Sequence, residues 1–392
     1  MGQRTRIALN VVVVLLAVVG GFYQIYVKPV LATFGYSPDR IINPTGNTNC
    51  KTVPELKACE KLVLHQPTGV IYLACSTPSS RAHWVPATNQ LNETGASTED
   101  YVATYDPATS RITRLTMPDF NNGRGFSSHG MDVVPSDADP TVLFIYLVNH
   151  RVPLGGVRAK DVGADSSIEI FKTKVGGKTL EHIKTVEDPT IIAPNDVIGS
   201  ADGTSFHFTN DHGSRVGLSR YFSLLGSKST SVVYCHIAEG CKYALPNTHA
   251  SNGIASAPNG TVYVANSIYG GVIVLERQTD NTLVLTESIA TDCAIDNLSV
   301  DADGQLWAAA LPKALMALNH IAHPELSSPS AAYRISINTG VNAFYGEKYK
   351  VETVFADDGS LMTGLTTTAY DSKRKRLFMH GIAASQLVVC KI

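Results

Sequence analysis

The chain lacks an excess of charge of either sign, since 32 Lys and Arg oppose 34 Asp and Glu among 392 residues, for a formal net charge of −2. A nucleic-acid-binding protein would carry a clustered basic surplus, so we expect no nucleic-acid partner. The chain also lacks a G-x-S-x-G motif, which disfavours a serine hydrolase of the α/β class. Helical periodicity beyond two turns is scarce, and we expect short helices only near residues 218–225 and 311–321.

Only one long apolar run is present, and it extends from Ile7 to Val27. About 20 apolar residues span a bilayer as a helix, and Arg4 and Arg6 before the run favour a cytosolic N-terminus. The alternative is a cleaved secretory signal, which would leave a secreted body in the same lumenal or extracellular space. We expect a single-pass membrane protein of the secretory pathway, divided into a cytosolic stub (1–6), a transmembrane signal anchor (7–27), a linker (28–48) and a folded hydrolase body (49–392).

Seven cysteines without a CxxC pair or a metal-finger spacing indicate an oxidising compartment. Cys235 and Cys241 are close enough to staple a hairpin, and Cys59 and Cys75 are symmetric about the predicted turn at 66–69. These pairings remain open, and Cys293 is the expected unpaired cysteine. Two sequons suit glycan attachment in such a compartment, at Asn92 and Asn259.

One pattern recurs six times along the chain: a polar residue, an apolar segment, a turn with Gly or Asp, and a strongly apolar strand. The polar leaders fall at positions 60, 129, 195, 252, 297 and 364. Units averaging about 60 residues are typical of a β-propeller blade of four strands. We therefore predict an all-β, six-bladed β-propeller with an N-terminal transmembrane helix. Cys50 and Cys390 would then pair and close the ring, whereas two β-sandwiches are the alternative fold.

Equivalent repeat positions in a propeller lie at equivalent distances from the central channel. Four of the leaders, with Asp296 directly before the fifth, would therefore bring two carboxylates and three amides together on the axis. An all-oxygen set of this kind suits Ca²⁺, which takes 6–8 oxygen ligands, and it suits zinc or copper poorly. For any one of these asparagines alone, turn capping is the simpler explanation. The predicted calcium ligands are Glu60, Asn195, Asn252, Asp296 and Asn297.

Two histidines occupy equivalent places in the second repeat. His129 leads that repeat and His150 ends its second strand, so both are expected at one mouth of the channel. A histidine pair near a metal favours acid–base chemistry over a purely structural role. Asp211 and His212 end the corresponding strand of the third repeat and are expected to line the same mouth.

These residues resemble the serum paraoxonase/arylesterase family of calcium-dependent lactonases and esterases, from about Cys50 to Cys390. The matching segments include 126–130, 147–150, 195–196, 209–212, 251–254 and 296–300. The resemblance implies a six-bladed propeller and a catalytic calcium held by the five residues named above. It also implies that His129 and His150 form a histidine dyad and that Cys50 and Cys390 are bridged.

One position departs from the family pattern. The resemblance implies a second, buried calcium held by an Asp directly after the first Glu, by Asp196 and by the Met131 carbonyl, but Lys61 stands at the Asp position. An ammonium beside a dication is unfavourable in a low-dielectric interior. Our hypothesis is that Lys61 replaces this structural ion by pairing with Asp196, so that one catalytic calcium remains.

The function expected from these observations is calcium-dependent hydrolysis of a small hydrophobic lactone or aryl ester. One alternative is a membrane-tethered binding scaffold whose calcium is purely structural. Another is a biosynthetic propeller enzyme of the strictosidine-synthase-like type. Three loops are expected to wall the pocket, at 76–84, 213–226 and 311–325, with the apolar residues Trp84, Phe222, Leu224, Leu225, Leu315, Met316 and Leu318. The alternative is that these side chains pack locally or rest against the bilayer.

Overall fold

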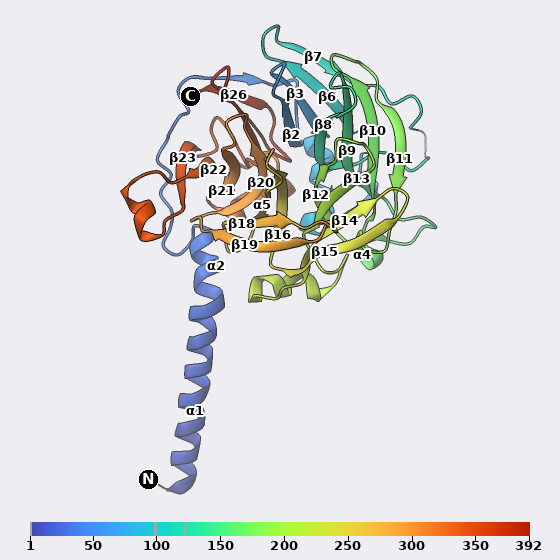
Figure 1. Cartoon of the computed structure of the whole chain (residues 1–392). Helices are drawn as coiled ribbons and strands as arrows, with labels where there is room; N and C mark the ends of the chain where they lie inside the picture. The colour runs from blue at the N-terminus through green and yellow to red at the C-terminus, as the bar shows by residue number, and fades with distance from the viewer. Residues whose placement is uncertain (1, 98–99, 121–122) are drawn as a thin grey trace.

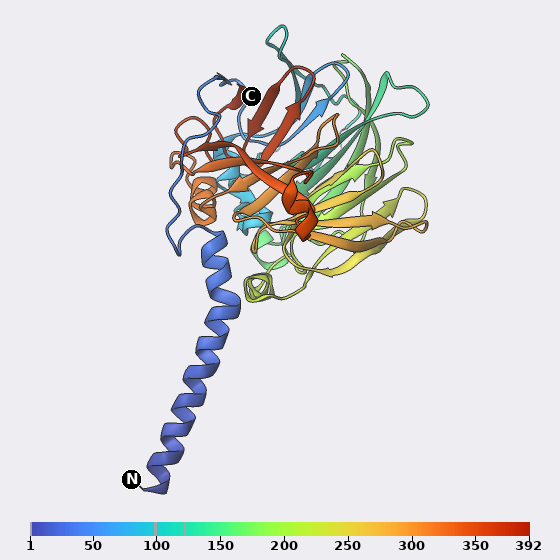
Figure 2. The ribbon, with the colours of Figure 1, turned by 60° about the vertical axis from the view of Figure 1, so that its left-hand side comes forward.

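The protein is described by a computed structural model that covers residues 2–97, 100–120 and 123–392. It begins with a long helical segment formed by α1 (Gln3–Phe22), η1 (Tyr23–Val27) and α2 (Lys28–Thr33). This segment is exposed up to residue 20 and projects away from the body (Figures 1 and 2). By length and composition alone it can cross a membrane. It starts before and ends after the predicted span of 7–27, and Met1 of the predicted stub lies outside the described residues.

The body consists of six sheets of four antiparallel strands. The first strand of each of five sheets, and β24 in the sixth, contact one another in a closed ring around the central axis (Figure 1). The predicted six-bladed propeller is confirmed. The innermost strands are β2 (Cys59–His65), β8 (Ser128–Pro135), β12 (Pro194–Gly199), β16 (Ser251–Ser256), β20 (Ala294–Val300) and β24 (Thr367–Asp371).

The other strands extend each sheet outward in chain order, except that β1 forms the outer edge of the sixth sheet. In the first three blades they are β3 (Val70–Cys75), β6 (Tyr101–Asp106), β7 (Arg111–Arg114), β9 (Val142–Arg151), β10 (Asp165–Lys174), β11 (Glu181–Val186), β13 (Ser205–Asn210), β14 (Thr230–His236) and β15 (Gly240–Thr248). In the last three they are β17 (Val262–Asn266), β18 (Val272–Arg277), β19 (Leu283–Ile289), β21 (Leu306–Leu311), β22 (Ser330–Ile337), β23 (Tyr349–Asp357), β25 (Arg376–His380), β26 (Leu387–Lys391) and β1 (Cys50–Val53).

The ring is closed by joining the two ends of the body. β1 pairs antiparallel with β26 at the outer edge of the sixth blade, with Cys50 opposite Cys390. A disulfide links these two cysteines, as predicted. Further disulfides join Cys59 to Cys75 and Cys235 to Cys241, so both suggested hairpin staples are present, and Cys293 is free and buried.

The core lies between neighbouring blades because alternate strand residues face alternate sides of each sheet. Phe206 and Phe208 of β13, for example, pack against Tyr146 and Ile168 of the preceding blade. Burial of apolar area at about 25 cal/mol per Å² is the main stabilising contribution of such clusters. Closing the ring also removes free sheet edges at the axis.

Short elements decorate the face of the propeller nearest the long helix. The predicted helices near 218–225 and 311–321 are present as η4 (Leu218–Leu225) and α5 (Ala314–Ala322), although α5 starts three residues late because β21 extends to Leu311 and Pro312 follows. The remaining short elements of this face are α3 (Pro78–Arg81), β4 (Trp84–Val85), η2 (Pro86–Thr88), β5 (Gln90–Leu91), η3 (Glu93–Gly95) and α4 (Ala159–Val162). The helix η5 (Val341–Tyr345) joins β22 to β23 at the end of these strands opposite α5.

Candidate active site

Five of the six innermost strands carry an irregularity at the predicted site residues. The pairing register shifts at Glu60 in β2, and it shifts between Pro194 and Val197 in β12 and at the matching places in β8, β16 and β20. A β-bulge of this kind inserts an extra residue and re-aims side chains. Successive residues such as Asp296 and Asn297 can therefore both contribute to the channel. β24 has an unbroken register and contributes no predicted ligand.

The close approach of blades at these bulges requires a glycine. Gly253 follows Asn252, and a Cβ added there would lie 2.5 Å from the Cα of Asn297 and 2.6 Å from the carbonyl oxygen of Asp296. Any side chain would push the fourth and fifth blades apart at the axis. The Asn-Gly pair therefore brings the ligands of neighbouring blades together.

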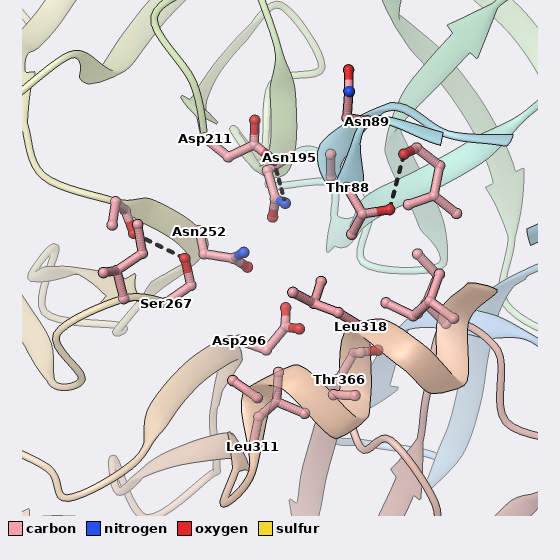
Figure 3. A pocket seen from close by; sticks show the side chains of 18 of the residues that line it. Thr88, Asn89, Asn195, Asp211, Asn252, Ser267, Asp296, Leu311, Leu318 and Thr366 are labelled. Carbon is pink, nitrogen blue, oxygen red and sulfur yellow. Dashed lines mark hydrogen bonds between the residues drawn. The ribbon is translucent and has the colours of Figure 1, made fainter. Parts of the chain in front are cut away.

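Three amide oxygens at the axis are buried without a hydrogen-bond partner. They are the Oδ1 atoms of Asn195, Asn252 and Asn297. Figure 3 shows the side chains of Asn195, Asn252 and Asp296 converging from different blades on the same space. Buried polar atoms normally have a partner because an unsatisfied group costs about 1–3 kcal/mol. Asn195 and Asn252 occupy the first position of their bulges and Asn297 the second position of its own. Three unsatisfied oxygens on neighbouring inner strands fit a cation.

The two carboxylates of the set occupy an environment that resists negative charge. Burial raises the pKa of Glu60 to about 7, even though a hydrogen bond from Thr366 and the charge of Arg81 oppose the shift. Burial, followed by the charge of Glu60, raises the pKa of Asp296 well above its usual value. A divalent cation would favour ionisation of both carboxyl groups.

The donor set matches calcium better than a softer metal. In the described parts of the chain, no group of three or more His, Cys, Asp or Glu side chains is placed to hold a metal. The five residues instead combine two carboxylates with three amides, and carbonyl and carboxylate oxygens are the ligands that Ca²⁺ prefers. The Nδ2 atom of Asn297 donates to Glu60 Oε1 at 2.9 Å, which orients the amide so that its oxygen remains available.

His129 and His150 lie together, one behind the other. Their ring centroids are 5.1 Å apart, and His129 faces the cavity while Ser166 Oγ lies 2.8 Å from Nδ1 of His150. Burial lowers the pKa of His150 to about 3 and that of His129 well below its usual value, with Arg81 adding to both shifts. His129 Nδ1 and His150 Nε2 have no hydrogen-bond partner, so a neutral pair is available to accept a proton.

The next residues along the same strands form a second level of the channel. Lys61 is buried and donates through its ammonium to Asp196 Oδ2, and to the Leu298 carbonyl at 3.3 Å. Asp196 Oδ2 also accepts the backbone N–H of Ile254 at 3.0 Å. Burial raises the pKa of Asp196, and Lys61 opposes this shift. The expected contact between Lys61 and Asp196 is present, and Met131 lies beside Lys61 in a separate cavity at this end.

A cavity of about 290 Å³ opens above the first level of oxygens. Four predicted ligands line it together with His129, Asp211 and His212, whereas Asn297 is buried beneath. Asn195 donates to Asp211 at 3.3 Å, and His212 Nε2 lies 3.0 Å from the Ala87 carbonyl. Figure 3 shows Leu318 of α5 and Leu311 facing the same space.

The predicted pocket loops contribute only in part. Leu224, Leu315 and Leu318 line the cavity, but Phe222, Leu225 and Met316 are not among its lining residues. Trp84 is buried, and its Nε1 donates to the His150 carbonyl at 2.9 Å, so this side chain supports the dyad rather than walling the pocket.

Three site residues were missed from the sequence. Thr366 donates to Glu60 Oε2 at 2.7 Å, Arg81 donates to the Ser128 carbonyl at 2.8 Å directly behind His129, and Phe34 lines the cavity. The sixth repeat leader was placed at Gly364, but β24 begins at Thr367, and the residue before this strand takes the axial position. The turn after β24, at residues 372–375, contains no Gly or Asp. The sixth repeat therefore matched the sequence pattern poorly, and its start was misplaced.

An apolar cavity above a ring of axial oxygens, with a buried histidine pair beside it, defines a class of six-bladed propeller built for small-molecule chemistry. The chain belongs to the arylesterase family, whose family model matches residues 96–392. Serum paraoxonase/lactonase 3 of Homo sapiens is 24% identical over 333 residues, or 84% of this chain and 86% of that protein. Serum paraoxonase/arylesterase 2 of Gallus gallus is 28% identical over 252 residues, or 63% of this chain.

The alignment with the chicken protein spans 65% of that protein's length, slightly less than two thirds. Among solved structures, a putative gluconolactonase has a TM-score of 0.50 at 10% sequence identity and covers 89% of this chain and 93% of its own. Identity this low shows similarity of fold alone.

Proposed function

We propose that the chain hydrolyses lactones or aryl esters in the cavity above the axial oxygens, with one calcium ion bound there. The observation that carries this proposal is the set of three unpartnered amide oxygens facing two carboxylates. Membership of the arylesterase family supports the reaction class, and the names of the relatives include paraoxonase, arylesterase and lactonase.

The residues that would hold the ion are Glu60, Asn195, Asn252, Asp296 and Asn297. When bound, calcium would supply Lewis-acid polarisation of the substrate carbonyl. The protein itself contributes preorganisation, because Thr366 and Asn297 fix the Glu60 carboxylate by hydrogen bonds of 2.7 and 2.9 Å. Fixed dipoles of this kind need little rearrangement during the reaction.

His129 is proposed to accept the proton of the attacking water. Its ring faces the cavity and is neutral at physiological pH because burial lowers its pKa. Asn195 Nδ2 lies 3.4 Å from His129 Nε2, and His150 packs behind the ring, so both residues limit its movement. His150 would take up the proton from His129 while Ser166 orients its ring.

A single ion is proposed because Lys61 provides the positive charge at the second level of the channel. Its ammonium pairs with Asp196, which would otherwise be a buried carboxylate without a counter-charge. A second calcium at this level would require displacement of that ammonium.

The N-terminal helix is proposed to anchor the chain with its first residues in the cytosol and its body in the lumen or outside the cell. The three disulfides agree with an oxidising compartment. The proposed glycan acceptors Asn92 and Asn259 are both exposed.

The test is a panel of lactones and aryl esters incubated with the full chain, with and without a calcium chelator. Hydrolysis that disappears on chelation and returns with calcium is the expected result. Activity that is indifferent to chelation would reject the calcium site, and the absence of hydrolysis at any calcium concentration would favour the binding-scaffold alternative.

A further inference from the structure

The segment after the membrane helix is part of the propeller body, although the sequence suggested a linker. Residues 29–32 are partly buried, and Thr33, Phe34 and Gly35 are buried. Thr33 Oγ1 donates to the Tyr269 carbonyl at 3.2 Å. Figure 1 shows α2 entering the body beside α5. The anchor is therefore attached to the face that contains the cavity.

A turn at Gly35 positions this segment against the propeller body. Gly35 has a φ of +77°, which disfavours any L side chain, and a Cβ there would lie 2.1 Å from the Pro312 carbonyl oxygen. The backbone N–H of Arg40 donates to the Gly35 carbonyl at 3.0 Å. The chain thus folds back directly after Phe34, against the connection between β21 and α5.

Arg40 ties the segment to the loop before β20. Its guanidinium donates to Cys293 Sγ and to the Asp292 carbonyl, and it lies 3.8 Å from the Asp292 carboxylate. The same guanidinium donates to the Ala32 carbonyl at 3.3 Å, which joins both sides of the turn. Only two residues lie between Cys293 and Asp296, so the contact is close in the chain to the proposed calcium ligands.

Phe34 faces the cavity from this fixed position. It packs with Ala294 and Ala314 in one apolar cluster and is one of the residues that line the cavity, as Asn252 and Asp296 are. Alanines on both sides leave the aromatic ring as the bulkiest part of this wall. A bulky residue on a pocket wall limits the length of an apolar group that the pocket admits.

We propose that Phe34 is a specificity-determining residue that sets the size of the apolar group of the substrate, and that Arg40 is the positioning residue that holds it. This inference rests on the proposed ester or lactone hydrolysis. It makes the membrane-proximal segment a component of the pocket and not only a tether.

The first experiment compares 4-nitrophenyl esters from acetyl to octanoyl with the full-length chain in detergent micelles. Phe34→Ala should raise the ratio of kcat/KM for the octanoyl over the acetyl ester by about tenfold, the scale of discrimination for apolar groups in a pocket. Phe34→Trp should lower this ratio. Phe222→Ala is the matched control, because Phe222 is 53% exposed on the same face and does not line the cavity. An unchanged ratio in both Phe34 variants would overturn the proposal.

Arg40→Gln should change the same ratio in the same direction through KM, with kcat changed less than threefold. Arg40→Lys, which keeps the charge toward Asp292, should restore part of the wild-type preference. Equal loss of kcat for every ester, without a change of preference, would show a structural role only and would reject Arg40 as the positioning residue.

A binding measurement separates failure of this inference from failure of the proposed function. Methyl octyl ketone, which cannot be hydrolysed, is titrated into the Phe34→Trp chain and into the unaltered chain, whose indole emission comes from Trp84 and Trp307, and the difference in emission is recorded. A saturable change of emission, absent with acetone, is expected even if no ester is hydrolysed. No change of emission would place residue 34 away from the bound apolar group and overturn the inference.

Discussion

The same strands build two levels of the central channel, but the buried polar groups of the two levels differ in whether they have partners. On the cavity side, Asn195 and Asn252 present oxygens without partners. At the next level, the adjacent residue Asp196 is paired with the ammonium of Lys61. One set of bulges can therefore place unpartnered oxygens at one level and a buried ion pair at the next.

The largest effect is expected from loss of an anionic group on the cavity side. Asp296→Asn keeps the shape of the side chain but removes one of two charges that would offset calcium. We expect kcat/KM for a lactone to fall by at least about 10³-fold, the scale of several kcal/mol associated with metal catalysis. Calcium affinity should fall in parallel in a titration. The control is Asp303→Asn, at an exposed turn. Full activity of Asp296→Asn would contradict the proposed cation site on the cavity side.

Lys61→Met tests the level that carries its own charge. Removing one member of a buried ion pair leaves Asp196 without a counter-charge and should cost about 3–5 kcal/mol in the free energy of unfolding. Urea titrations in chelator measure this loss. Lys61→Asp should recover stability only when calcium is added and should raise the bound calcium from one to two ions per chain. Two tightly held ions in the unaltered protein would contradict the proposal.

His129→Gln removes the proposed base while leaving both levels of the channel intact. The rate of lactone hydrolysis should fall by about 10²-fold, the lower end of the range for general base catalysis. Calcium affinity and urea midpoint should remain as in the wild type. An unaltered rate would transfer the role to another group, with Glu60 the nearest carboxylate at 3.9 Å.

A smaller effect is expected from His380, which lies in the sixth blade behind Thr366 and is not among the residues that line the cavity. Its Nδ1 accepts the N–H of Gly381 at 2.8 Å, and its Nε2 lies 3.1 Å from the Leu56 carbonyl, an arrangement suited to the neutral ring. Burial lowers its pKa to about 4 from the usual 6.5. The unfolded chain therefore binds this proton more readily than the folded chain does.

Stability from this group is complete above about pH 6.5 and falls as the pH decreases toward about 4. Between pH 7 and pH 5.5 the loss should be about 1 kcal/mol, and the difference in urea midpoints should be smaller in His380→Gln. The exposed His323 provides the control variant. An equal pH dependence in His380→Gln and the wild type would show that other groups determine the slope.

The architecture was accessible from sequence because it repeats. A pattern that recurs six times predicted six blades, and the positions of Cys50 and Cys390 predicted the closure. The leaders also named five residues that the structure brings to one axis, as the cavity lining and the hydrogen bond from Asn297 to Glu60 show. Repetition carries this information because each blade places its first strand in the same way.

Features that depend on irregular backbone could not be predicted from the sequence. The bulges that let Asp296 and Asn297 both contribute to the channel follow no composition signal, and the unbroken β24 gave the weakest repeat. Phe34 was missed for a different reason. It follows a helix whose composition is typical of a membrane span, and the tertiary contacts of Arg40 that hold it against the propeller cannot be predicted from composition.

The pairing of β1 with β26 also constrains the order of events during synthesis on the ribosome. All five proposed ligands, from position 60 to position 297, emerge well before residues 387–391, which complete the last blade. Until β26 has left the exit tunnel, the ring has a gap and its strands have a free edge. A nascent chain therefore contains all five residues before its last blade is complete, and binding of the proposed calcium ion would be a late step in its maturation.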